Sequence, residues 1–334
     1  MPRPRSGFLP MEAVSNVTFL QLSGIAVGVS AAGCCAALAV SAVGLGSKYK
    51  RFLNAAVPGR HARETIQGGE PAAFRSGDGV PLEGRVFKPE APHRRTVIFC
   101  HQAGSNMAAV QRYGWFLPGH GFNVLTFDFR TEAQGPARRA RPWVTDSDVN
   151  DLVGAIRYAQ SRFGLRKGEL GLLGISRGGS AALCAAAREE VVGAVVADGS
   201  FDTSSIVQTY MYARRPGQSS IKRAPGLATR WRSRALLRMA EWRFGCRFHS
   251  VVRALRQSRH TALLLIHGEG DKYIPHAHAV ELYGHAPGQR TKELWLAPAA
   301  GHNCTALRHR DEYERRVAKF FDTHLPDGCA GEME

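Results

Sequence analysis

Paired cysteine motifs are absent from this chain. Its seven cysteines form no C-x-x-C or C-x-x-H spacing, which is the spacing typical of zinc sites and disulfide frameworks. No other cluster of metal-ligating residues and no internal repeat is visible. We therefore expect free thiols, and a protein that needs neither a metal ion nor a cofactor.

Charged side chains are missing between Ala13 and Ser47. Within this stretch, residues 17–46 are dominated by Ala, Val, Leu, Ile, Gly and Ser. A membrane-spanning helix needs about 20 apolar residues, whereas the apolar part of a signal peptide has about 7–15. The length therefore predicts a single uncleaved transmembrane helix over residues 17–46, after a tail of residues 1–16. A cleaved signal peptide and a lipoprotein-type site at Cys34 are the alternatives.

Basic residues flank this predicted span unequally. Arg3 and Arg5 precede it, and five Lys and Arg follow it in a predicted juxtamembrane linker, residues 47–64. Positive charge is enriched on the cytoplasmic side of membrane proteins. The count therefore favours a single-pass membrane protein with a cytoplasmic C-terminal domain, and an exported domain on a signal anchor stays open as the other topology.

Acidic residues are almost missing from residues 203–260. Thirteen Lys and Arg stand there against the single acid Glu241, in a chain whose net charge is +16. Such an excess favours an anionic partner, which could be membrane lipid, an acidic substrate or nucleic acid. No nucleic-acid-binding motif accompanies the charge, so we do not expect a nucleic acid partner.

Part of this basic segment has the pattern of an amphipathic helix. Arginines recur there every four residues and so share one face of a helix, beside a neighbouring face of aromatic and apolar residues. The arginines are Arg230, Arg234 and Arg238, and the neighbouring residues are Trp231, Ala235, Met239 and Trp242. A basic helix with tryptophans suits a membrane surface. A solvated helix whose arginine stems cover apolar surface is the alternative.

Strand-like and helix-like runs alternate along the rest of the chain. The expected strands are Pro81–Pro89, Thr96–Cys100, Asn123–Phe129, Leu170–Ile175, Val191–Ala197, Thr261–Ile266 and Lys292–Leu296. The expected helices are Met107–Leu117, Asp148–Phe163, Gly179–Arg188, His276–Tyr283 and Asp311–His324. This alternation predicts an α/β protein with a mainly parallel sheet covered by helices on both faces.

A G-x-S-x-G motif, Gly174-Ile-Ser-Arg-Gly178, lies between a predicted strand and a predicted helix. This context is typical of a nucleophile elbow, in which a sharp turn exposes the serine above the sheet. The turn needs small neighbours, and the N-terminus of the following helix favours developing negative charge. Ser176 is therefore the candidate nucleophile.

An acid and a histidine follow Ser176 at the ends of later predicted strands. Asp271 closes the motif His-Gly-Glu-Gly-Asp, with Ile274-Pro275 behind it. His302 lies in Gly-His-Asn, between the last strand and the last helix. The chain order is therefore Ser, Asp, His, and each candidate follows a strand.

This order and these motifs resemble the α/β-hydrolase superfamily. The resemblance covers residues 65–326 and is nearest to the dienelactone-hydrolase-like and serine-aminopeptidase-like branches. It implies an α/β-hydrolase fold, a catalytic triad of Ser176, His302 and Asp271, and a helical cap insert at residues 203–260.

The resemblance also implies an oxyanion hole formed by the backbone N–H groups of Arg177 and Ala103. Asp198, after the preceding strand, is the alternative acid. Residues 327–334 form a C-terminal tail outside the predicted domain.

Two positions depart from the pattern of the superfamily. Gln102 stands where a glycine often follows the histidine of the oxyanion loop, and its side chain could reach the site. Thr131 replaces the glycine of a D-x-R-G motif, in which we expect Asp128 and Arg130 to stabilise the loop near the elbow.

These features together predict a membrane-anchored serine hydrolase that cleaves an ester, thioester or amide through an acyl-enzyme. The first expectation is carboxylesterase or lipase-like activity on a small, lipid-like acyl substrate, with the membrane as partner. A serine-aminopeptidase-like peptidase, an acyltransferase and a catalytically inactive membrane scaffold with the same fold are the alternatives.

Overall fold

The computed structural model describes residues 64–91, 94–133, 143–212, 227–258 and 261–326. All of them belong to one compact unit of the chain, Ala55–Glu334. The predicted transmembrane helix, both predicted tails and all but the last residue of the predicted linker lie outside the described residues. Among the helices within these ranges, none is long and apolar enough to cross a bilayer.

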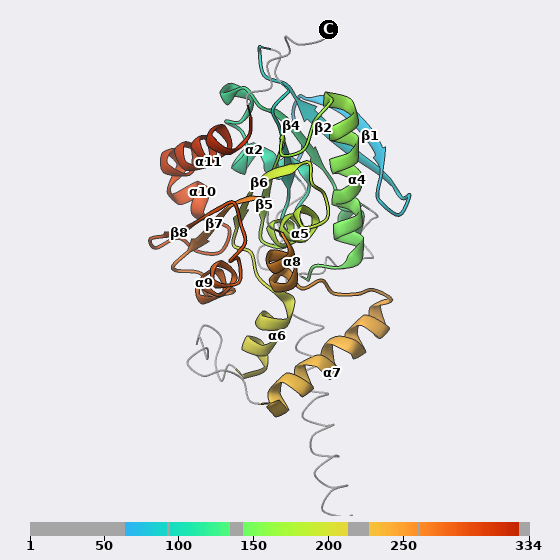
Figure 1. The fold of residues 1–334 in the computed structure, drawn as a ribbon, viewed down its shortest axis with the longest axis vertical. Coiled ribbons are helices and arrows are strands. Elements are labelled where there is room, and N and C mark those ends of the chain that lie inside the picture. The colour runs from blue at the N-terminus through green and yellow to red at the C-terminus, as the bar shows by residue number, and fades with distance from the viewer. Residues whose placement is uncertain (1–63, 92–93, 134–142, 213–226, 259–260, 327–334) are drawn as a thin grey trace, which may run out of the picture. The chain divides into compact units, whose positions relative to one another are not determined.

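An eight-stranded sheet forms the centre of the fold, with the strand order β1-β2-β4-β3-β5-β6-β7-β8 (Figure 1). The strands are β1 Glu70–Arg75, β2 Pro81–Phe87, β3 Thr96–Cys100, β4 Asn123–Phe127, β5 Leu170–Ile175, β6 Val192–Asp198, β7 Ala262–Gly268 and β8 Thr291–Ala297. Strand β2 runs antiparallel to β1 and β4, and the other neighbouring pairs are parallel. The mainly parallel sheet predicted from the sequence is confirmed.

Helices cover both faces of the sheet, as predicted. One face packs against α4 Asp146–Phe163, α5 Arg177–Ala186, α8 Val251–Gln257 and α9 Ala277–Gly284. The other packs against α2 Val110–Tyr113, α10 Thr305–Arg308 and α11 Arg310–His324. Successive residues of a strand point to opposite faces, so Ile98 of β3 joins the first cluster while Val97 and Phe99 join the second.

Two expectations about local structure were wrong or incomplete. Strand β1 was not predicted, because its Pro-Ala-Ala stretch lacks the β-branched residues that mark strands, and most of it is exposed. The expected helix Met107–Leu117 is broken into a 3₁₀ turn, the four-residue α2 and an irregular segment. Gly114 ends α2 and Pro118 begins a second 3₁₀ turn, and both residue types disfavour a continuing helix.

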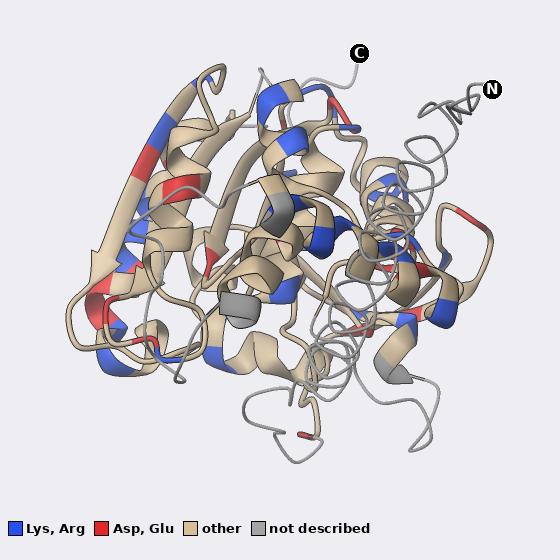
Figure 2. Cartoon of the chain, turned by 90° about the horizontal axis from the view of Figure 1, so that it is seen from below, with Lys and Arg blue, Asp and Glu red and all other residues tan. Residues whose placement is uncertain are grey.

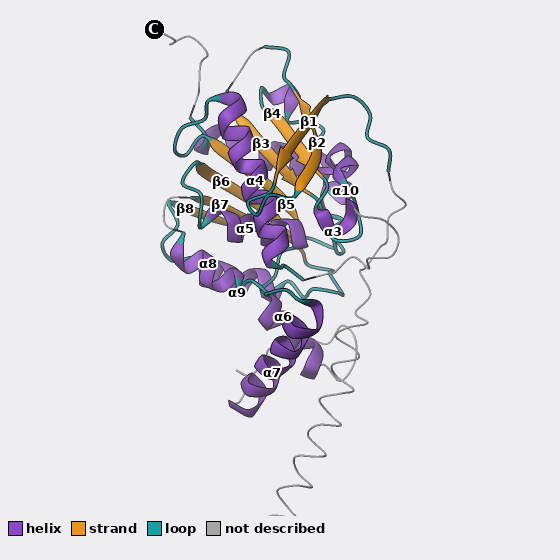
Figure 3. Ribbon diagram, turned by 90° about the vertical axis from the view of Figure 1, so that its right-hand side faces the viewer, coloured by secondary structure: helices purple, strands orange, loops and turns teal. Residues whose placement is uncertain are grey.

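The basic segment between β6 and β7 contains α6 Thr203–Tyr212 and α7 Leu227–Phe244. These two helices contact each other and lie beyond the end of the sheet, outside the two helix layers (Figure 3). The chain after α7 returns to the α/β body through a bridge between Phe248 and Thr145, next to the start of α4. Helix α8, the last part of the segment, packs in the core.

Candidate active site

Ser176 occupies the sharp turn between β5 and α5. Its φ of 53° and ψ of −117° are strained for a residue with a side chain. The turn is held by hydrogen bonds from the Ser176 N–H to the carbonyl of Asp198 at 2.7 Å and from the Ser180 N–H to the carbonyl of Ser176 at 3.0 Å. The strained turn is therefore tied to both α5 and the neighbouring strand β6.

Glycines make room for this turn. A Cβ added to Gly174 would lie 2.4 Å from the Cα of Gly179, and one added to Gly178 would lie 2.2 Å from the carbonyl oxygen of Cys100. Both separations are shorter than any side chain tolerates, so only glycine fits. The close approach also brings the first turn of α5 against the end of β3, where the loop with Ala103 begins.

His302 reaches Ser176 from the loop that follows β8. Its Nε2 lies 3.2 Å from the Ser176 Oγ, and its Nδ1 lies 2.6 Å from the Asp271 Oδ2. The loop is held by the Tyr113 hydroxyl, which donates to the carbonyl of Asn303 at 2.9 Å. The structure thus joins the three predicted residues in one hydrogen-bonded chain.

Asp271 is anchored by contacts to both of its carboxylate oxygens. Oδ1 accepts from the backbone N–H groups of Tyr273 and Ile274 at 2.8 and 2.9 Å. Oδ2 contacts the rings of His302 and His267, the latter at 3.3 Å. Burial acts to raise the pKa of Asp271, but the hydrogen bonds from His267 and His302 outweigh it and hold that pKa well below its usual range.

The ionised carboxylate determines which nitrogen of His302 carries hydrogen. A carboxylate only accepts hydrogen bonds, so the Nδ1 of His302 must donate to Asp271. The Nε2 of the neutral ring then presents a lone pair to the hydroxyl of Ser176. This tautomer is the one that can remove a proton from the serine.

His267, the first residue of the motif His-Gly-Glu-Gly-Asp, also contacts Asp271, and this contact was not predicted. Its Nε2 lies 2.7 Å from the carbonyl of Ile274, which can only accept, so Nε2 carries the hydrogen. The same nitrogen faces the Asp271 Oδ2. The spacing of four residues in His-Gly-Glu-Gly-Asp was the signal that could have linked the two side chains.

The two backbone N–H groups predicted for the oxyanion hole come from different segments of the chain. Arg177 directly follows Ser176, and Ala103 is buried in the loop after β3. That loop is held by His101, whose Nδ1 donates to the carbonyl of Gln102 at 2.8 Å while its Nε2 accepts from the N–H of Phe129 at 3.3 Å. His101 therefore links the start of this loop to the segment that follows β4.

The Gln102 side chain is buried, and neither its Oε1 nor its Nε2 has a hydrogen-bond partner among the described residues. An unsatisfied buried amide costs free energy. Within the described part of the chain, the Gln102 amide makes no hydrogen bond to Ser176 or His302, so a role for this side chain in the site is not supported.

The side chain of Arg177 is buried and explains the departure at Thr131. Its Nη1 donates to the hydroxyl of Thr131 at 3.1 Å and lies 3.5 Å from the carboxylate of Asp148. The guanidinium also stacks over the ring of Phe129, 5.2 Å from its centroid. Thr131 therefore takes part in positioning the residue that follows the candidate nucleophile.

Asp128 and Arg130 have the structural contacts that were expected of them. The Oδ1 of Asp128 accepts from the N–H of Met107 at 2.6 Å. Arg130, at the start of α3 Arg130–Ala133, pairs with Asp78 and donates its Nε to the buried Asp151 at 2.6 Å. These bonds tie the loop after β4 to α4.

Asp198, the alternative acid, lies at the end of β6 and is fully buried. Among the described residues, its carboxylate accepts one weak hydrogen bond, from the Thr305 hydroxyl at 3.4 Å. Burial raises the pKa of Asp198 to about 7. The Nδ1 of His302 instead contacts Asp271, so the geometry favours Asp271 as the acid.

A sequence model of the prolyl oligopeptidase family matches residues 120–328. The chain belongs to the prolyl oligopeptidase family. This match includes Ser176, Asp271 and His302. The resemblance to the α/β-hydrolase superfamily that the motifs indicated is thereby confirmed, and the protein has a fold of that superfamily.

Curated relatives are similar to this chain in sequence, and solved structures are similar to it in fold. The uncharacterized protein YfhR of Escherichia coli is 26% identical over 258 residues, which cover 75% of this chain and 80% of YfhR. The esterase Pf2001 of Pyrococcus furiosus superposes with a TM-score of 0.60 at 20% identity, covering 80% of this chain and 96% of the esterase. The acylaminoacyl peptidase of Pyrococcus horikoshii gives 0.55 at 17% identity, covering 80% of this chain and 44% of the peptidase. The family and the fold support a hydrolase.

Proposed function

We propose that the protein is a membrane-anchored serine hydrolase that cleaves a carboxylic ester, thioester or amide. The observation that carries this proposal is the hydrogen-bonded chain from the Ser176 Oγ through His302 to Asp271. Membership of a hydrolase family supports it. Residues 17–46 are the proposed anchor, on the ground of their length and lack of charge.

The proposed reaction begins when the Ser176 Oγ attacks the acyl carbonyl carbon and its proton passes to the Nε2 of His302. Asp271 holds the ring in the required tautomer and stabilises its cationic form. The N–H groups of Arg177 and Ala103 donate to the oxyanion. His302 then protonates the leaving group, which departs and leaves the acyl-enzyme. Water attacks this ester by the same route, releasing the acid and restoring the serine.

An ester substrate is the first choice, and an amide is the second. The likeness to a solved esterase favours esters, whereas the family name and the likeness to an acylaminoacyl peptidase favour a peptidase. A panel of p-nitrophenyl esters and aminoacyl p-nitroanilides separates the two. We expect faster turnover of the esters, and turnover confined to the anilides would replace the esterase with the peptidase.

A fluorophosphonate probe tests whether the site reacts at all. We expect the full chain to be labelled and the Ser176→Ala variant to remain unlabelled. Ser161→Ala is the matched control, because Ser161 is exposed on α4. An unlabelled wild-type chain would favour the inactive scaffold. Product analysis with an added acyl acceptor distinguishes an acyltransferase from a hydrolase.

A further inference from the structure

Helix α7 has one face packed on the protein and one face in solvent. Ser233, Leu236 and Ala240 are fully buried and share one side of the helix. Because an α-helix turns once in 3.6 residues, the opposite side carries Trp231, Arg238 and Trp242. The helix therefore presents a continuous outer face along its length. Figure 2 shows the described Lys and Arg positions in blue, viewed from the end of the protein at which α6 and α7 lie.

Large apolar side chains line the middle of this outer face. Trp242 is 86% exposed, Leu227 is 75% exposed and Trp231 is 67% exposed. Trp231 and Trp242 are eleven residues apart, about three turns, so they point in nearly the same direction. Large apolar side chains that are exposed together on one face of a helix indicate that this face binds a partner.

Arginines flank these apolar side chains on both sides, and Arg238 lies among them. Arg230 and Arg234 lie toward one side, and Arg232 and Arg243 toward the other, all of them exposed. The only acid of the helix, Glu241, does not balance them. Its Oε1 accepts from the N–H of Phe248 at 3.0 Å, and its Oε2 pairs with Arg238.

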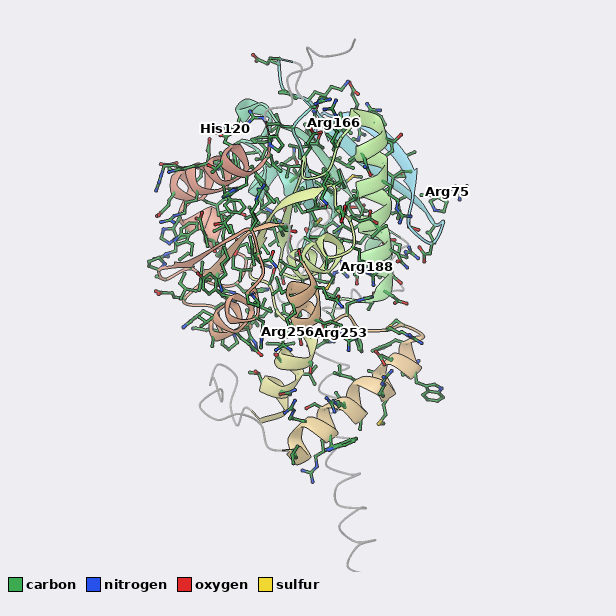
Figure 4. All side chains as sticks on the ribbon, in the orientation of Figure 1. Arg75, His120, Arg166, Arg188, Arg253 and Arg256 are labelled. Atoms are coloured by element: carbon green, nitrogen blue, oxygen red, sulfur yellow. The ribbon has the colours of Figure 1, made fainter. Side chains whose placement is uncertain are left out.

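More positive charge lies at the same end of the protein. Arg253 and Arg256 are exposed on α8 and lie at the end of the α/β body from which α6 and α7 extend (Figure 4). This end is therefore complementary to an extended negative surface rather than to a single anion.

We propose that the outer face of α7 binds the surface of an anionic phospholipid bilayer. Tryptophan rings in the centre of the face enter the headgroup region, where an apolar ring with a polar N–H is most stable. The flanking arginines contact lipid phosphates, since basic residues near an anionic leaflet are attracted to it. Tryptophans between arginines are the arrangement of a helix that lies in the plane of the membrane surface.

This interaction is independent of the proposed hydrolysis and concerns where the active site works. Helix α6 begins five residues after the end of β6, at the edge of the sheet where Ser176 and Asp271 also follow their strands. A bilayer bound by α7 therefore faces the end of the protein that contains the candidate active site. Failure of the lipid contact would leave the proposed chemistry untouched.

The test uses the full chain in lipid nanodiscs and follows tryptophan fluorescence. Phospholipids with brominated acyl chains quench only tryptophans that reach the bilayer. We expect quenching in discs that contain phosphatidylglycerol, and less quenching in discs of phosphatidylcholine alone. The Trp231→Phe/Trp242→Phe variant should lose most of this difference, because Trp143 and Trp295 are buried in the core and Trp115 is partly buried against it.

Charge variants separate this contact from general attraction. Arg234→Glu/Arg238→Glu should abolish the extra quenching in anionic discs. Arg75→Glu/Arg166→Glu is the matched control, since it makes the same change in net charge at exposed positions away from α7 (Figure 4), and it should quench like the wild type.

Three outcomes would overturn the proposal. The first is equal quenching in neutral and anionic discs, and the second is a quenching difference that survives the double tryptophan substitution. The third is a fluorescence response to an oligonucleotide or polyglutamate without one to anionic lipid, which would assign the face to another polyanion. Fluorophosphonate labelling of the same samples shows separately whether the site is intact.

Discussion

Asp271 and Asp198 are buried carboxylates at the ends of neighbouring strands, and their surroundings differ. Two backbone N–H groups and two histidine rings surround the first, whereas the second accepts a single weak hydrogen bond within the described part of the chain, from Thr305. The pKa values consequently move in opposite directions. Only the group kept ionised can stabilise a cationic His302.

Exchanging each acid for its amide distinguishes their roles. Asp271→Asn should lower kcat by roughly 10³–10⁴-fold, because the amide cannot hold the same tautomer of His302 or stabilise its charge. Asp198→Asn should stay within about tenfold of the wild type, since Asp198 does not contact the histidine. Steady-state ester hydrolysis measures both, and a larger loss in Asp198→Asn would exchange the two assignments.

Asp198 should also make stability depend on pH. Burial raises its pKa from an ordinary 3.8 to about 7, so the folded protein holds the proton more tightly than the unfolded chain. The contribution of this carboxyl to stability is therefore complete below about pH 4 and is lost as pH rises toward about 7, by up to about 1.4 kcal/mol per pH unit. Asp198→Asn cannot lose a proton.

Denaturant unfolding between pH 4 and pH 8 checks this dependence. The variant should gain stability relative to the wild type as pH rises through that window. A constant difference at all pH values would show that Asp198 is ionised in the folded protein throughout.

At the scale of elements, the turn from β5 into α5 depends on backbone contacts that exclude side chains. Gly178 is the tightest of these positions, because it faces the carbonyl at the end of β3. The same approach sets the distance between Arg177 and the loop of Ala103. Packing of α5 on β3 and the geometry of the site are therefore a single property of the fold.

Gly178→Ala should destabilise the protein by about 1–3 kcal/mol, since the new methyl group must displace backbone. Fluorophosphonate labelling of Ser176 should fall with it. Gly284→Ala is the control: a Cβ there meets nothing within 4 Å, so stability should be unchanged or slightly higher. Thermal unfolding compares the two, and equal midpoints would show that α5 can move away from β3.

The sequence predicts an element well when the residues that determine it are close together in the chain. Strand β5, the elbow and the loop of His302 were predicted correctly, because each is marked by residues adjacent in the chain. Strand β1 and the break in the expected helix Met107–Leu117 were not predicted. A half-exposed edge strand carries a weak pattern, and the periodicity of the broken segment continued past the residues that end it.

The site shows the same division. Ser176, Asp271 and His302 could be predicted because they follow strands whose ends meet in a parallel sheet. The contact between Arg177 and Thr131 could not, because it joins a buried guanidinium to a loop from another strand. The second partner of Asp271, His267, was likewise not predicted, since a strand residue gives no sign of which way its ring nitrogen faces.

At the scale of the whole molecule, the proposed anchor and the basic face of α7 both concern the membrane. They rest on different observations, one on a long uncharged run in the sequence and one on exposed side chains in the structure. Each can therefore be tested without the other.

The anchor predicts that the full chain resists extraction from membranes by alkaline carbonate. A spanning helix stays in the bilayer under these conditions, whereas charge-based surface binding is released. Removal of residues 1–46 should make the remaining protein extractable, and removal of residues 1–12 should not. Immunoblots of the pellet and the supernatant give the result, and full extraction of the intact chain would contradict a transmembrane span.

Helices α6 and α7 lie in the connection between β6 and β7, two strands that pair with each other in the sheet. The entropic cost of closing such a loop grows slowly, by about 0.6 kcal/mol for each doubling of its length. Insertions, deletions and substitutions in this connection can therefore occur without moving the reacting atoms. We therefore expect the sequences of homologues to diverge most between β6 and β7. Such homologues would share the same reaction and differ in their substrates and in the surfaces that they bind.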